Sequence, residues 1–235
     1  MRMPFFLLPL ALALPLGAQG FEGTVSMRLS SPQGEMDAKY QFKGDRLAMV
    51  MTASSGPMAG SEIRMIMDPV AKTMTMLSPI PAGMGGGGTF PADAKGIKMV
   101  MPLDGTAAGQ GATGPAPTIT KLGTSQTIAG MKCDDFELVQ DNTKMRMCLA
   151  TGMGKFTFPE MNGGMGGRGR GGNSTPAWAK ALGSNPGFPL KVWEANGKIA
   201  MEVTAIDRGA VPASAFETPA GYMDMSGMMG GGRRP

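Results

Sequence analysis

Alternation of apolar and polar residues is the feature that most limits the folds open to this chain. Residues 21–30 carry apolar side chains at odd positions, and residues 36–43 carry them at even positions. Because successive side chains on a strand point to opposite faces, this pattern predicts an antiparallel sheet with one buried and one wet face. Further segments of this kind lie at 47–53, 63–67, 72–77, 97–101, 119–128, 132–139, 144–150, 190–194 and 198–206.

The segments between these strands have the composition of tight turns. Gly44-Asp45 and Asp68-Pro69 favour reversals, since glycine accepts positive φ and proline presets φ for a turn. Asn196-Gly197 is typical of a two-residue hairpin. One short helix is expected at 175–182, where a threonine cap and a proline begin it and a glycine follows it. The sequence therefore predicts a mostly β chain, a meander of hairpins with one short helix.

The first residues are typical of a secretory signal. A basic start at Arg2 precedes an apolar run at 5–16 and the small pair Gly17-Ala18. The run is shorter than the roughly 20 residues that span a bilayer, and no other segment reads as a transmembrane span. We therefore expect a signal peptide at 1–18 and a periplasmic or secreted protein.

The mature part is expected to form one antiparallel β domain over residues 19–222. Glycine-rich tracts, poor in large apolar groups, interrupt this domain and lack the burial that would order them. We predict flexible insertions at 81–93, 104–117 and 160–173, followed by a disordered tail rich in glycine and methionine at 223–235.

Composition excludes several classes of function. The formal net charge of +4 is spread thinly, and we interpret the basic run at 168–172 as a loop, so no nucleic-acid partner is expected. The chain has 0 histidines, which removes the commonest general base and metal ligand. No nucleophile elbow, phosphate loop or zinc spacing is present. Asp134 and Asp135 point to opposite faces of a strand and are interpreted as a solvated strand end. We expect no enzyme, no cofactor and no catalytic residues.

Two cysteines, Cys133 and Cys148, flank a candidate hairpin turn. Cys133 shares the parity of Asp135, and Cys148 shares that of Arg146, so both are expected on the polar face of neighbouring strands. An oxidising compartment would pair them. We predict a structural disulfide, since a redox-active pair more often has the Cys-x-x-Cys spacing.

Methionine is unusually frequent, at 25 residues, and many of these fall in Met-x-Met pairs. Residues two apart on a strand share a face, so each pair projects together, in several strands with aliphatic neighbours. One hypothesis is a concave, methionine-lined sheet that holds an apolar small molecule or lipid, because thioether chains adapt to shape. Its candidate binding residues are Met49, Met51, Met65, Met67, Met74, Met76, Met99 and Met101.

Two other hypotheses account for the same methionines. In the first, they only fill the core of a structural or interaction module, whose partners would be other proteins of the cell envelope. In the second, thioethers bind Cu(I), which prefers soft ligands. The better copper candidates are in the tail, where they need not be buried: Met223, Met225, Met228 and Met229.

Five short motifs follow one another along the chain: GDRL at 44–47, a hairpin at 68–76, IAGMKC at 128–133, FPLK at 188–191 and FETPAGY at 216–222. Their order resembles that of a family of secreted bacterial proteins known only as a domain of unknown function. The resemblance covers roughly residues 21–222, apart from the glycine-rich tracts. It implies a fold similar to that of the LolA and LolB lipoprotein carriers, a curved antiparallel sheet forming an unclosed barrel around an apolar cavity. It implies no reaction.

Overall fold

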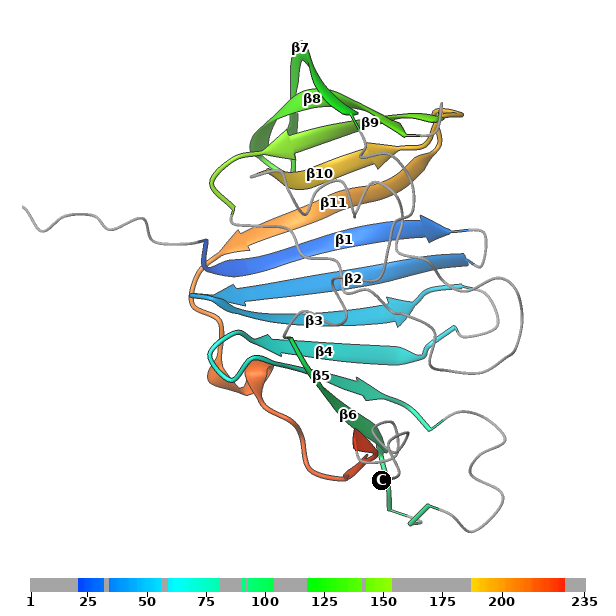
Figure 1. Cartoon of the computed structure of the whole chain (residues 1–235), viewed down its shortest axis with the longest axis vertical. Coiled ribbons are helices and arrows are strands. Elements are labelled where there is room, and N and C mark those ends of the chain that lie inside the picture. Colours follow the sequence, from blue (N-terminus) through cyan, green and yellow to red (C-terminus); the bar gives the residue numbers. More distant parts are fainter. Residues whose placement is uncertain are drawn as a thin grey trace, which may run out of the picture.

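The computed structural model describes residues 21–31, 34–55, 59–80, 90–91, 93–103, 118–140, 143–153 and 187–226. Every strand in these ranges belongs to one 12-stranded sheet (Figure 1). The strands are β1 (Gly23–Ser31), β2 (Gly34–Lys43), β3 (Arg46–Ala53), β4 (Glu62–Asp68), β5 (Thr73–Ser78), β6 (Gly96–Pro102), β7 (Thr118–Ile128), β8 (Met131–Gln140), β9 (Thr143–Ala150), β10 (Phe188–Trp193), β11 (Ile199–Arg208) and β12 (Tyr222–Asp224).

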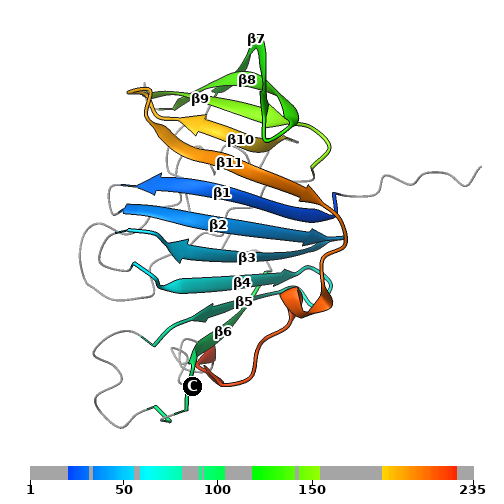
Figure 2. The same cartoon turned by 180° about the vertical axis from the view of Figure 1, so that it is seen from behind.

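The sheet consists of two meanders that meet in its middle. Its strand order is β12-β6-β5-β4-β3-β2-β1-β11-β10-β9-β8-β7, so β1 to β6 run outward to one end and β7 to β11 run inward from the other. The two meanders join where β1 pairs with β11. The ends of the order do not pair with each other, so the sheet is unclosed, as Figures 1 and 2 show from opposite sides. All pairs are antiparallel except β12 with β6, which is parallel.

The sheet curls around the face that carries the alternating apolar residues. Strands β2 and β10 are separated by β1 and β11, which is about 14 Å along a sheet with strands about 4.8 Å apart. The rings of Phe42 and Phe188, on these two strands, nevertheless have centroids 5.9 Å apart. Such contact across the sheet requires a concave surface. This face holds the main core, which extends from Leu138 in β8 to Met65 in β4.

A segment at 209–226 crosses the opposite, convex face and is called the strap here. It contains the 3-10 turn η2 (Ala213–Phe216) and ends in β12, and it is drawn in orange and red in Figures 1 and 2. Phe216 packs with Ala48 and Ile66 in a second, small core. Arg46 stacks its guanidinium over the Phe216 ring, 4.9 Å from the centroid, and donates a hydrogen bond to the Phe216 carbonyl at 3.0 Å. The strap thereby fixes the β6 end of the sheet to its middle.

The expected fold class is confirmed: the described chain is mostly β, in one curved, unclosed sheet. Each of the eleven predicted strand segments overlaps one of β1 to β11. The prediction of a disordered tail from residue 223 is wrong at its start, since β12 contains Met223 and the described chain continues to Ser226. The expected helix at 175–182 and the insertions at 104–117 and 160–173 lie outside the described residues, as does most of the insertion at 81–93. No helix within the described ranges has the length and hydrophobicity needed to cross a membrane.

Candidate ligand-binding face

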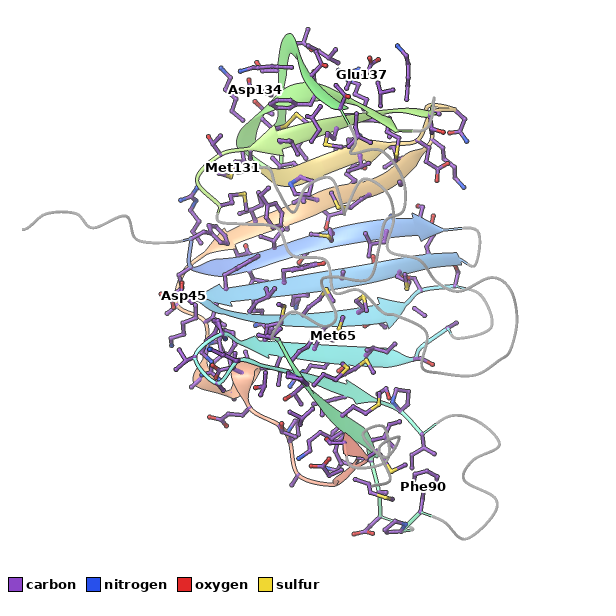
Figure 3. The ribbon with its side chains drawn as sticks, in the orientation of Figure 1. Asp45, Met65, Phe90, Met131, Asp134 and Glu137 are labelled. Atoms are coloured by element: carbon purple, nitrogen blue, oxygen red, sulfur yellow. A yellow bond between two sulfur atoms is a disulfide. The ribbon has the colours of Figure 1, made fainter. Side chains whose placement is uncertain are left out.

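The eight predicted methionines lie together on the concave side of strands β3 to β6. The strand register places Met65 between Met49 of β3 and Met76 of β5, and Met76 lies opposite Met99 of β6. Two residues further along each strand, a second row on the same face consists of Leu47, Met67, Met74 and Met101. Met51 faces Ile63 on the other side of the first row. Figure 3 shows sulfur atoms gathered around Met65. This group of eight residues is called the methionine face below.

Burial divides the methionine face into two parts. Met49, Met51, Met65 and Met99 are buried, and the first three belong to the main core. The other four are only half-buried, and they follow β5 and its two neighbours: Met67, Met74, Met76 and Met101. The face therefore continues the core outward into a surface of apolar side chains that keep part of their area exposed.

Cross-strand pairing of methionines gives this surface its chemical character. Directly opposed residues have Cβ atoms about 5 Å apart, so neighbouring thioethers are within reach of one another. Methionine has three rotatable side-chain bonds and a polarizable sulfur, and a surface built from it can change shape around an apolar guest. The facing residues that complete it, Leu47, Ile63 and Ile97, are also apolar. Such an arrangement can bind hydrocarbon without directing a reaction.

An aromatic group bounds the methionine face on the β2 side. Tyr40 lies opposite Met49 and stacks on Phe42, with ring centroids 6.2 Å apart. Phe42 also meets Phe21 and Phe188 edge-on, with centroids 5.5 and 5.9 Å apart. Burial raises the pKa of Tyr40 well above its usual range, so its hydroxyl remains protonated in the folded protein.

Ser78 is a polar member of this face that the sequence reasoning missed. It continues β5 two residues after Met76, and register places it opposite Ile97 of β6. Its side chain is buried, and its Oγ atom has no hydrogen-bond partner within the part of the chain that the structure describes. The sequence pattern could have identified Ser78, because it has the same parity as Met74 and Met76 and so lies on the same face of the strand.

The predicted disulfide between Cys133 and Cys148 is present, with Cα atoms 5.3 Å apart. It links β8 to β9, and Cys148 lies opposite Asp135. Parity therefore placed both cysteines correctly, on the face of Asp135 and Arg146. Their surroundings differ from the expectation, because both cysteines are buried although they lie on the face expected to be wet.

The interpretation of Asp135 as part of a solvated strand end is wrong. Its side chain is buried and accepts hydrogen bonds from Thr124 Oγ1, Gln126 Nε2 and Arg146 Nη2, each at 2.7 Å. The cause is an irregularity in β7, whose register against β8 shifts between Lys121 and Ser125 and brings polar side chains over Asp135. Asp134 remains partly exposed and pairs with Lys121 at 2.6 Å.

Opposing effects act on the pKa of Asp135. Burial raises it, whereas the hydrogen bonds from Arg146, Thr124 and Gln126 and the charge of Arg146 lower it, and the net result lies below the usual value. Arg146 is itself held over the ring of Trp193, with its guanidinium carbon 5.0 Å from the centroid. These groups are paired with one another, and we interpret them as a stabilising cluster.

The tail methionines are only partly described. Met223 lies in β12 opposite Ile97, and Met225 donates its backbone N–H to the Lys98 carbonyl at 2.8 Å. Met228 and Met229 lie outside the described residues. Among the residues that the structure covers, no three of the His, Cys, Asp and Glu side chains are grouped so that they could hold a metal ion.

Comparison with known proteins identifies the family. Residues 91–222 match the family described as "Domain of unknown function (DUF4412)", a range that is more than half of the chain. The chain therefore belongs to this family, which confirms the resemblance noted in the sequence. No curated protein matches the chain.

Solved structures with some likeness to the chain are distant from it. A structure of PNGF-II has 10% sequence identity and a TM-score of 0.45, covering 88% of this chain and 31% of its own. MucB in complex with MucA(peri) has 12% identity and a TM-score of 0.39, covering 86% of this chain and 56% of its own. This chain thus spans about a third of PNGF-II and little more than half of MucB. Likeness at this level carries no information on activity.

Proposed function

We propose that this protein is an exported, non-enzymatic binding protein that holds the acyl chain of a lipid on its methionine face. The observation that carries the proposal is that half of the methionines of that face keep part of their area exposed beside a buried core. Met65 is a buried core residue, while Met76, directly opposite it on β5, and Met74, in the next row, remain half-buried. An acyl chain lying along β5 would remove the remaining apolar area of these methionines from water, which is favourable.

Two further features support the exported and non-enzymatic parts of the proposal. The buried Cys133–Cys148 disulfide is a bond that persists in oxidising compartments, as outside the cytoplasm. The one buried charged side chain of the described residues, Asp135, accepts a hydrogen bond from Arg146. Asp135 and Arg146 therefore serve to stabilise the folded chain.

The proposal is tested by placing a charge on the half-buried part of the methionine face. Met76→Glu should weaken binding of a fluorescent acyl probe at least ten-fold, because the carboxylate would need burial beneath the ligand. The urea midpoint should fall only modestly, since Met76 already meets water. Thr75→Glu is the matched control: the residue is equally half-buried, on the same strand, but on the convex face.

The structural-module hypothesis makes the opposite prediction. If the methionines serve only as core, the wild-type protein will bind no acyl probe. The only measurable effect of Met76→Glu will then be a change in the free energy of unfolding. Buried Met65 offers an internal reference, because Met65→Glu should unfold the protein under either hypothesis. Saturable binding that survives in Thr75→Glu and is lost in Met76→Glu supports the binding function.

A further inference from the structure

Ser78 places a buried hydroxyl at one end of the methionine face. The residue is 4% exposed, and no group of the described residues hydrogen-bonds its Oγ. Buried hydroxyls are nearly always bonded, because leaving one unpaired costs free energy. Such a group at a binding surface is explained if the bond is made to a ligand.

The surroundings of Ser78 restrict what that ligand can be. Ile97 lies directly opposite on β6, and the β4–β5 register continued by one residue places Ile63 on the other side. The nearest cation along β6, Lys98, projects to the convex face and pairs with Asp224 at 2.7 Å. A carboxylate or phosphate at Ser78 would therefore be buried among apolar side chains, with no opposite charge supplied by the described strands beside it, which is costly.

Resting on the proposed function, we infer that Ser78 Oγ donates a hydrogen bond to the carbonyl oxygen of an uncharged acyl ester. The chain of that ester lies over Met76 and Met74. From Ser78 to Met74 is four residues of strand, about 13 Å, so the half-buried methionines of β5 form a continuous track away from the hydroxyl. This assigns a direction to the bound ligand: the ester lies at the Ser78 end and the hydrocarbon continues toward Met74.

Three polyene probes separate the contribution of the head group from that of the hydrocarbon. They are methyl parinarate, which has an ester, parinaric acid, which has a carboxylate at neutral pH, and diphenylhexatriene, which has no head. Titrated against the whole mature protein by fluorescence, the ester should bind more tightly than the acid. Ser78→Ala should weaken the ester about five-fold, the effect of one neutral hydrogen bond, and leave diphenylhexatriene unchanged.

Stability of the unliganded protein gives a second, independent readout. Because Ser78→Ala removes an unpaired buried hydroxyl, its urea midpoint should equal or exceed that of the wild type. A hydroxyl with a structural role would lower it. Ser26→Ala, on the convex side of β1, is the matched control and should alter neither the binding of any probe nor its preference for the ester.

The possible failures are distinguishable. If the wild type binds none of the three probes, the proposed function falls and this inference falls with it. If the wild type binds them but Ser78→Ala retains full affinity for the ester, or loses affinity for ester and hydrocarbon alike, the inference alone is wrong. Tighter binding of the acid than of the ester would also overturn it.

Discussion

Replacing the carboxylate of Asp135 tests how the β7 end of the sheet is held together. The perturbation is Asp135→Asn, which preserves size but removes the charge and turns one acceptor oxygen into a donor. Thr124, Gln126 and Arg146 all donate to Asp135 at 2.7 Å, so at least one of them will face the new amide N–H. Since β7 pairs with no described strand other than β8, the bonds from Thr124 and Gln126 add to the backbone ladder that attaches it to the sheet.

The expected loss of stability is set by burial and charge. Hydrogen bonds to charged groups are worth about 1.5–3 kcal/mol each, and breaking a buried ion pair costs about 3–5 kcal/mol. Arg146 has a side-chain exposure of 48% and can return to water, which lowers the cost. We expect Asp135→Asn to reduce the free energy of unfolding by about 2–4 kcal/mol, a large part of the total for a single domain.

Urea denaturation of the wild type and the variant measures this loss, with equal slopes required for the comparison. Asp134→Asn is the control, because the neighbouring carboxylate is 37% exposed and its pair with Lys121 should contribute less than about 1 kcal/mol. The pKa of Asp135 is lowered by folding, so the stability it contributes is present above the unfolded value, about pH 4, and is lost as pH falls further. The difference in free energy of unfolding between the wild type and Asp135→Asn should therefore become smaller over that acidic range. A difference in free energy of unfolding below about 0.5 kcal/mol at neutral pH would refute the reasoning.

Two further predictions concern the disulfide and the strap. Replacing Cys133 and Cys148 together with serine should lower the free energy of unfolding by about 3 kcal/mol, as expected for a loop of separation 15, and peptide mapping without reductant should find the two cysteines linked in the wild type. Phe216→Ala should cost about 3 kcal/mol in urea denaturation, because the ring is buried in the small core with Ala48 and Ile66; an effect below about 1 kcal/mol would show that the strap does not stabilise the sheet.

Local patterns in the sequence were sufficient to find the strands and the methionine face. Alternation fixes which side chains of one strand share a face, and this rule placed Met65 with Met67, Met74 with Met76 and Met99 with Met101. The strand register then brings these pairs together across β4 to β6. Alternation also placed Cys133 and Cys148 on one face, where they are bonded. Hairpin pairing carries this local information across the sheet, because consecutive strands are neighbours throughout β1 to β6.

Features that depend on long-range packing were missed. Asp135 is buried because an irregular register in β7 covers it, and the sequence of β8 holds no sign of that. Ala48 and Ile66 are buried on the face expected to be wet, since the strap packs there from more than a hundred residues away. Met223 joins the sheet through a parallel pair with β6, which depends on where the strap ends.

Native mass spectrometry of the protein purified from the cells that produce it tests the central claim most directly. The proposed function predicts a wild-type protein that carries an additional mass equal to that of a lipid with an acyl chain. That mass should disappear in Met76→Glu and persist in Thr75→Glu. The contradicting result is a wild-type protein that shows its own mass alone and also takes up no acyl ester when one is added. The methionine face would then be only a part of the core.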